Sequence, residues 1–181
     1  SYEIANNLAK KAVDNNVDLV VLAGDLHGMV EGEGKILDPF LKQNKKVLFI
    51  PGNWDSTKEH EQLRKKARSI HNYYVTYGNV GFVGIGTTDM RISLTEEDFA
   101  NIKRQFQRMK PSKKILVSHL HAKGSKAEFS GIEGDALLTR AIEEFSPDIM
   151  IAGHIHESEG IEDKINNTKI FQVGRSGKIL E

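Results

Sequence analysis

Apolar residues gather in four short, β-branched runs that are separated by segments of mixed polarity. Runs that are apolar at nearly every position are typical of parallel strands buried on both faces. They lie at 17–23, 46–50, 114–118 and 148–152. Elsewhere, apolar residues recur at three- and four-residue spacing, which indicates amphipathic helices. These helices are predicted over about 2–15, 34–44, 56–70, 95–109 and 135–145.

Two segments depart from this alternation and predict β-hairpins. In each of them, two apolar stretches flank a short turn made of Gly and Asn or of two Asn residues. The stretches are 73–77 with 80–85, and 160–165 with 168–173. A long polar loop is expected at 122–133. Helices that alternate with parallel strands, interrupted by hairpins, indicate a layered, mixed α/β fold.

Composition and charge narrow the classes of function. The chain has 181 residues, of which 39% are hydrophobic, and this suffices for one ordinary domain over 1–181. It has no cysteine, which excludes disulfides and zinc–thiolate sites, and no apolar run reaches membrane-spanning length. Its 25 basic and 25 acidic residues balance, which argues against nucleic acid as a partner. We expect a soluble, cytoplasmic protein with no membrane partner, and we leave open whether it forms a homo-oligomer.

The residues that carry chemistry come directly after the four buried runs. The turns there hold carboxylate, amide and imidazole groups, with glycine beside them in three of the four. They are Gly24-Asp25-Leu26-His27, Pro51-Gly52-Asn53-Trp54-Asp55, Ser118-His119-Leu120-His121 and Gly153-His154-Ile155-His156. Because the parallel strands of one sheet present their carboxyl ends at the same edge, we expect these groups to converge.

The types of side chain in these turns indicate a metal site. Asp, Asn and His without thiolate form a ligand set suited to Mn²⁺, Fe, Zn²⁺, Ni²⁺ or Co²⁺. Two such divalent ions, about 3.5–4 Å apart, could clamp a phosphate, with Asp25 as the carboxylate that they share. Each turn alone is commonplace, but four in succession are hard to attribute to chance. His60 and His71 lie in and at the end of a charged helix, and we expect both to be solvated.

At these four turns the chain resembles the calcineurin-like metallophosphoesterases, and among them the small microbial phosphodiesterases. The family carries the ordered blocks D-x-H, GD, GN-[HCN]-[DE], H and GH-x-H, and the last four occur here in the same order, with Trp54 at the [HCN] position. The resemblance implies an αββα sandwich of two mixed sheets between helices. It also implies that Asp25 bridges two metal ions and that His156 serves one of them. The ligands of the other ion would be completed by Asn53, His119 and His154.

The chain departs from the family pattern in two places. The D-x-H block, which supplies two metal ligands in the family, is absent, so we expect that an opening strand before Ser1 is missing. Trp54 stands where related phosphatases carry the His that protonates the leaving group, and an indole N–H cannot transfer a proton near neutral pH. His121 or His27 could act as the acid instead. Alternatively, His121 orients His119.

Two glycine-rich turns, one with Lys126 and the other with Arg175, are further candidates for contact with a phosphate. Backbone N–H groups and a nearby cation in such turns can bind phosphate oxygens. For Lys126 a solvated loop is the favoured interpretation. Arg175 follows the last hairpin strand, where the resemblance places a turn beside the metals, and it is a candidate substrate contact.

These observations predict a metal-dependent phosphoesterase. Its substrate would be a small phosphodiester or phosphomonoester, attacked by a metal-bound hydroxide. The alternative is a non-catalytic scaffold or binding subunit that retains the fold, and the absent D-x-H block and Trp54 motivate it. A nuclease is a third possibility, but the sequence shows neither the basic groove nor the aromatic platforms expected of one. The metal content of the purified protein would discriminate the enzyme from the scaffold.

Overall fold

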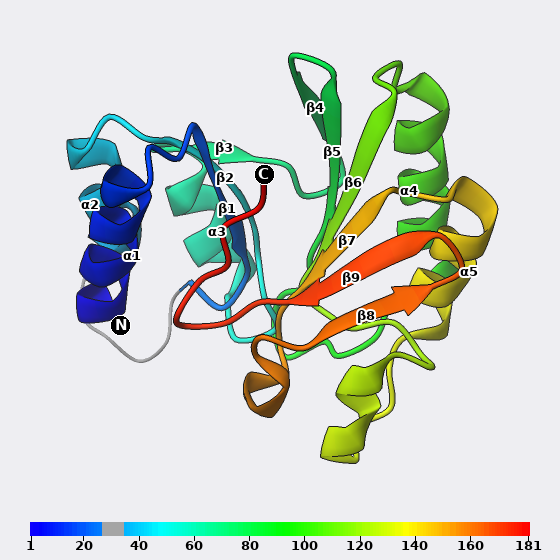
Figure 1. The fold of residues 1–181 in the computed structure, drawn as a ribbon. Coiled ribbons are helices and arrows are strands. Elements are labelled where there is room, and N and C mark those ends of the chain that lie inside the picture. The colour runs from blue at the N-terminus through cyan, green and yellow to red at the C-terminus, as the bar shows by residue number, and fades with distance from the viewer. Residues whose placement is uncertain (27–34) are drawn as a thin grey trace.

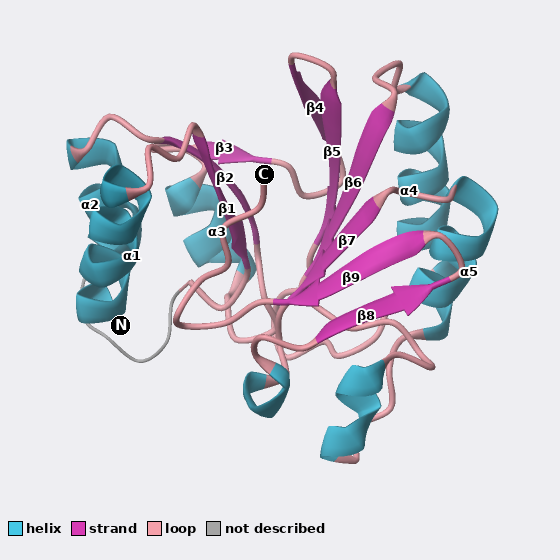
Figure 2. Ribbon diagram, in the orientation of Figure 1, coloured by secondary structure: helices cyan, strands magenta, loops and turns pink. Residues whose placement is uncertain are grey.

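The computed structural model describes residues 1–26 and 35–181, and its elements form four layers (Figure 1). Two sheets pack face to face, and helices cover the outer face of each (Figure 2). This arrangement confirms the αββα sandwich. Within the described residues, no helix is long and apolar enough to span a membrane.

The first sheet consists of three parallel strands in the order β1-β2-β3. They are β1 (Leu19–Ala23), β2 (Lys46–Ile50) and β3 (Arg68–Ser69). The helical elements beside this sheet are α1 (Tyr2–Asp14), the 3₁₀ helix η1 (Lys35–Leu37), α2 (Asp38–Lys42) and α3 (Thr57–Leu63). Val47 and Phe49 of β2 point toward these helices and are buried among their apolar side chains.

The second sheet has six strands in the order β4-β5-β6-β7-β9-β8. They are β4 (Tyr74–Tyr77), β5 (Val80–Ile85), β6 (Lys113–Ser118), β7 (Ile149–Ala152), β8 (Glu162–Ile165) and β9 (Thr168–Gln172). The inner strands are parallel, and an antiparallel hairpin forms each edge. Its outer face is covered by α4 (Glu96–Arg108) and α5 (Ala136–Phe145).

The space between the two sheets is filled by one apolar cluster. From the first sheet and the segment after it come Leu48, Ile50 and Ile70, and from the second come Phe82, Ile115, Val117, Ile149 and Ile151. Side chains packed from both faces fix how the sheets lie on each other. The carboxyl ends of β1, β2, β6 and β7 are thereby held close together.

Turn chemistry predicted both hairpins correctly. β4 pairs with β5 across Gly78-Asn79, and β8 pairs with β9 across Asn166-Asn167. Gly78 and Asn166 have φ values of 56° and 52°, in the left-handed region that a tight two-residue hairpin turn requires. The apolar stretches together with their turn residues therefore carried enough information to place four strands.

The helix predicted over 56–70 is shorter than expected. α3 begins after Ser56, which caps it, but ends at Leu63, and Arg68–Ser69 then forms β3. Polar residues such as Lys66 suit a helix as well as a turn. The helix does not continue, because β3 pairs with the open side of β2 and Ile70 becomes completely buried. These interactions stabilise the chain more than further helical turns would.

The prediction that the four buried runs lie in one sheet is wrong. β1 and β2 belong to the first sheet, whereas β6 and β7 belong to the second. β1 is also only half-buried at each of its five positions, because within the described residues it pairs with β2 alone. An apolar run does not reveal whether its strand is central or at an edge.

Two weaker expectations were also refined. The helix expected over 34–44 is divided into η1 and α2. The loop expected at 122–133 contains a 3₁₀ helix, η2 (Lys126–Ser130), and the turn after β7 contains another, η3 (His156–Ser158).

Candidate metal centre

The turns after β1 and β2 lie against each other at the edge of the first sheet. Gly24 and Asp25 have φ values of 97° and 53°, so the chain reverses sharply after β1. A Cβ on Gly24 would lie 2.7 Å from the Cα of Gly52, and one on Gly52 would collide with the Asp25 carboxylate. Both positions therefore need glycine. The Asp25 carboxylate accepts the backbone N–H of Trp54 at 3.0 Å, which fixes its direction.

His119 and His154 enter from the second sheet. His119 follows β6, is almost fully buried, and has its Nδ1 2.7 Å from the carbonyl oxygen of Ala23 in the first sheet. His154 follows β7 with a φ of 68°, which turns its ring back toward the edge of the sheet. The backbone N–H of Gly153 donates to the His119 carbonyl at 3.1 Å, so the two turns are joined.

Four of the predicted ligands meet at one point. The Oδ1 atom of Asn53 lies 2.9 Å from Nε2 of His119 and 3.1 Å from Nδ1 of His154. Nε2 of His119 is also 3.4 Å from Oδ2 of Asp25. One donor atom each from Asp25, His119 and His154 lies within 4.8 Å of the other two. Turns from two different sheets thus supply the cluster.

The protons of His119 show why this cluster suits a cation. A carbonyl oxygen can only accept, so the Ala23 oxygen places a proton on Nδ1. In the neutral ring, Nε2 then carries a lone pair, and it faces Oδ1 of Asn53 and the Asp25 carboxylate. Lone pairs directed at one another at these distances repel. A divalent ion placed among them would turn this repulsion into coordination, so the residues present fit a metal.

The charge state of the cluster agrees with a role in metal binding. Burial raises the pKa of the Asp25 carboxyl, but His119 when protonated, with its Nε2–H then donating to the carboxylate, and the backbone N–H of Trp54 act against this, and the pKa lies below its ordinary value. Burial, followed by the neighbouring His119, lowers the pKa of His154. At neutral pH the cluster therefore has an ionised carboxylate beside a neutral imidazole, which are the forms that bind metals.

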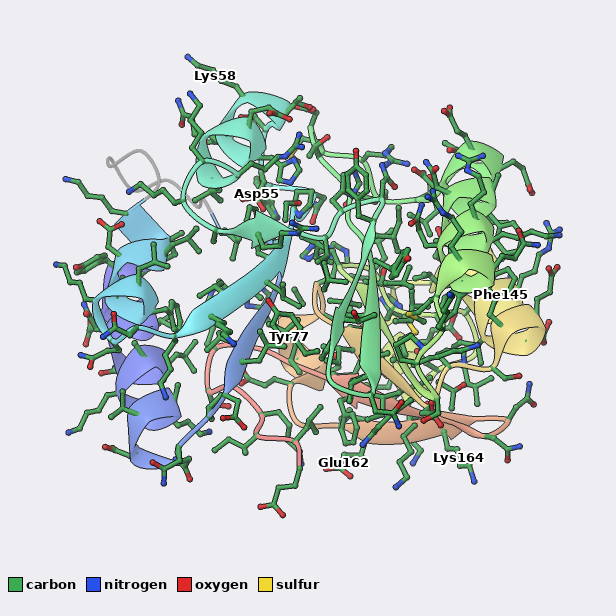
Figure 3. All side chains as sticks on the ribbon, turned by 90° about the horizontal axis from the view of Figure 1, so that it is seen from above. Asp55, Lys58, Tyr77, Phe145, Glu162 and Lys164 are labelled. Carbon is green, nitrogen blue, oxygen red and sulfur yellow. The ribbon has the colours of Figure 1, made fainter. Side chains whose placement is uncertain are left out.

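Asp55 holds the two turns of the first sheet together, and the sequence analysis assigned it no role. Its Oδ2 accepts the N–H of Gly52 at 2.7 Å and that of Leu26 at 3.1 Å, so one buried carboxylate joins the turn after β2 to the turn after β1. Asp55 lies between the end of β2 and α3 (Figure 3). In the sequence it is marked by an acid two residues after a candidate ligand, at the last position of the GN block.

His121 is buried next to the cluster but not in it. Its ring lies nearly parallel to that of His154, with 6.5 Å between centroids. Its Nε2 lies 3.1 Å from the Ile132 carbonyl, which places a proton there, and its buried Nδ1 has no hydrogen-bond partner among the described residues. The lone pair of Nδ1 is therefore available to a ligand.

The remaining predicted residues lie at the surface or outside the described chain. His156 begins η3, is exposed, and is not part of the close group of Asp25, His119 and His154. Arg175 is exposed in the turn after β9. Lys126 is exposed at the start of η2, and its Nζ lies 3.5 Å from the Glu162 carbonyl. His27 lies outside the described residues.

His60 and His71 form a second pair of rings, and the expectation that they are solvated is wrong. His60 is buried, with Nε2 2.8 Å from Oγ of Ser69 and its ring edge against Phe49. Nδ1 of His71 accepts the N–H of Gly86 at 3.0 Å. Burial lowers the pKa of both rings, and that of His71 falls to about 4. Their partners come from other elements, so the charged local sequence concealed their burial.

Comparison with known proteins identifies the class to which this fold and site belong. The family model of calcineurin-like phosphoesterases matches residues 1–158. The chain therefore belongs to the calcineurin-like phosphoesterase family, as the resemblance at the four turns indicated. The family consists of metal-dependent phosphoesterases, which in general bind divalent ions.

Individual relatives support this placement. The chain is 30% identical over 166 residues to MJ1162, an uncharacterised protein of Methanocaldococcus jannaschii, and the match covers 83% of this chain and 74% of the relative. The crystal structure of TT1561 from Thermus thermophilus superposes with a TM-score of 0.74 at 13% identity, over 96% and 84% of the two chains. The sulfate thiohydrolase SoxB of Thermus thermophilus superposes with a TM-score of 0.61 at 12% identity, over 97% of this chain and 38% of SoxB. The two superpositions show the shared fold.

Proposed function

We propose that the chain is a dinuclear metal-dependent phosphoesterase that hydrolyses a small phosphodiester or phosphomonoester. The observation that carries this proposal is the convergence of Asp25, Asn53, His119 and His154 from turns of two sheets, where lone pairs of Asp25, Asn53 and His119 are directed at one another. An apolar core needs no such arrangement, and unpaired buried polar groups cost stability. A bound cation gives the arrangement a physical reason.

The cluster would hold the first ion, and Asp25 would be shared with a second one. Among Mn²⁺, Fe, Zn²⁺, Ni²⁺ and Co²⁺, the oxygen and nitrogen donor set favours no single metal. Bound divalent ions would polarise the phosphate oxygens and activate the water that attacks phosphorus. His156, which follows His154 and Ile155 at the start of the exposed η3, is assigned to the second ion.

The residues around the cluster prepare it for this chemistry. The Ala23 carbonyl fixes the tautomer of His119, and the Trp54 N–H fixes the direction of the Asp25 carboxylate. Asp55 holds the two turns at a constant distance. Such preorganisation reduces the cost of assembling the site when substrate binds.

His121 is the candidate for moving a proton. Because its proton sits on Nε2 against the Ile132 carbonyl, the lone pair of the buried Nδ1 can accept a proton or a hydrogen bond at the site. Its Nε2 is directed at Ile132 and not at His119, so we favour this role over orientation of His119.

Arg175, on its exposed turn, remains a proposed substrate contact, and the cytoplasmic location remains a prediction.

Hydrolysis of bis(p-nitrophenyl) phosphate by the metal-loaded protein tests the proposal. We expect Asp25→Asn to abolish metal-dependent turnover, whereas Asp18→Asn, at an exposed position before β1, should leave it unchanged. Equal turnover of the two variants would contradict the proposal. A wild-type protein that binds metal yet shows no turnover on mono- or diesters would favour the scaffold alternative.

A further inference from the structure

The indole of Trp54 is exposed directly beside the candidate metal ligands. Trp54 is the chain's one tryptophan, and 58% of its surface is accessible. Its backbone N–H donates to the Asp25 carboxylate at 3.0 Å, so its backbone lies next to the cluster. Within the described residues, its ring has no stacking or hydrogen-bonding partner. A large rigid apolar surface is therefore left open next to the site where a phosphate would bind.

The backbone of Met90 is hydrogen-bonded to that of Asn53, the residue before Trp54, on a strained turn. Its backbone N–H donates to the Asn53 carbonyl at 2.8 Å, and its side chain is 57% exposed. Asp89 and Met90 have φ values of 54° and 64°, two successive left-handed residues of which neither is glycine. Thr57 holds this turn through its Oγ1, 2.6 Å from the Asp89 carboxylate. Such strain persists where the surrounding structure requires it, and here it holds the backbone of an exposed apolar residue against that of a ligand residue.

An exposed apolar residue also lies next to His121, on the side of the second sheet. The Ile132 carbonyl accepts from His121, whose ring faces His154, and the side chain of Ile132 is exposed. We call Trp54, Met90 and Ile132, whose backbones are hydrogen-bonded to Asp25, Asn53 and His121, the apolar rim. Its members come from segments that follow strands of both sheets.

Binding of a phosphate group alone does not account for the apolar rim. Metal ions and N–H donors bind a small anion, and a nearby indole does not strengthen its binding. Exposed apolar side chains that gather around a site instead indicate an apolar ligand group. Tryptophan is well suited to a planar group, because ring stacking adds to the burial of apolar surface.

We propose that Trp54, with Met90 of the apolar rim, is a specificity-determining residue that binds a planar aromatic group esterified to the phosphate. This inference rests on the proposed function, and it names the class of substrate as aromatic esters of phosphate. It also agrees with the inability of the indole to supply a proton, since aromatic alcohols leave readily without one.

Binding of two phosphonates to the zinc-loaded protein tests the inference. Phenylphosphonate and methylphosphonate carry the same anionic group, differ in the aromatic ring, and contain a P–C bond that is not hydrolysed. Because Trp54 is the one tryptophan, intrinsic fluorescence reports on that position alone. We expect phenylphosphonate to change the emission and to bind about tenfold more tightly than methylphosphonate, in line with stacking on one aromatic side chain.

Variants assign this preference to the indole. Measured by calorimetry, Trp54→Ala should bind the two phosphonates equally, and Trp54→Phe should retain most of the preference. Tyr73→Ala is the matched control, because Tyr73 is 57% exposed and its backbone hydrogen bonds are to Ile70 and Gly84, neither of which is a candidate ligand. Equal affinities in the wild type, no binding of either phosphonate, or an unchanged preference in Trp54→Ala would overturn the inference.

Metal content separates failure of the inference from failure of the proposed function. If the wild type retains zinc and binds both phosphonates alike, the metal centre stands and the role of Trp54 is wrong. If the protein retains no zinc, the proposed function is contradicted at its first step, and the inference falls with it.

Discussion

The molecule contains two pairs of histidine rings with nearly the same mutual geometry. The rings of His119 and His154 are 5.1 Å apart at 69°, and those of His60 and His71 are 5.5 Å apart at 87°. Both pairs are edge-to-face, and in both at least one pKa is lowered by burial. Ring proximity therefore does not by itself distinguish a binding site from a packed interior.

The two pairs differ in what their ring nitrogens meet. In the second pair, Nε2 of His60 faces a serine hydroxyl and Nδ1 of His71 accepts a backbone N–H. These lone pairs already have partners. In the first pair, Nε2 of His119 carries a lone pair that faces the amide oxygen of Asn53 and the carboxylate of Asp25, neither of which can donate. Unshared lone pairs therefore mark a site for a cation. Experiments on either pair of histidines can test this difference.

The largest effect is expected from removing a member of the first pair. His154→Ala should lower metal-dependent turnover by about 1,000-fold or more, because a bound ion supplies several kcal/mol of transition-state stabilisation. His71→Gln should change turnover little, since its ring is not part of the cluster. Steady-state kinetics on an aryl phosphodiester measures both. Comparable losses in the two variants would show that the pairs do not differ in the way described.

The second pair should instead control stability in mild acid. His71 is protonated in the unfolded chain near pH 6.5 but in the folded chain only near pH 4. Between these values the unfolded state binds more protons, so the free energy of unfolding falls as the pH falls, by about 3 kcal/mol over the window. Urea unfolding of the wild type and of His71→Gln at a series of pH values measures this. A wild-type slope that survives in the variant would exclude His71 as its source.

Asp55 should have a smaller effect that is confined to the first pair. Asp55→Ala removes the carboxylate that joins the turns after β1 and β2. We expect a loss of metal affinity or activity of about 10- to 100-fold, the range found for groups that orient metal ligands. Metal titration of this variant under conditions where circular dichroism shows it folded gives the value. An unchanged affinity would mean that the turns hold their positions without Asp55.

The sequence predicted those features that depend on neighbouring residues. The hairpin turn at Gly78 requires a left-handed residue, and such residues are visible in a sequence. The ligand turns after β1, β2, β6 and β7 were located because glycine and ligand residues follow apolar runs directly. Asp25, Asn53, His119 and His154 accordingly lie together as expected.

The features that depend on distant partners could not be predicted in this way. His60 lies among charged residues of α3, yet Phe49 and Ser69 from other segments bury it. The division of the four runs between two sheets depends on which strands pair, and the runs themselves are alike. The tautomer of His119 depends on the carbonyl of Ala23, which lies 96 positions away in the chain.

Calorimetric titration of Mn²⁺ into the metal-stripped protein tests the central claim most directly. The claim is that unshared lone pairs at the strand ends, and not paired histidines in general, bind a divalent ion. We predict that the wild type and His71→Gln bind Mn²⁺ with similar affinity and that Asp25→Ala loses this binding. Unchanged binding by Asp25→Ala, or loss of binding in His71→Gln while it remains folded, would contradict the account.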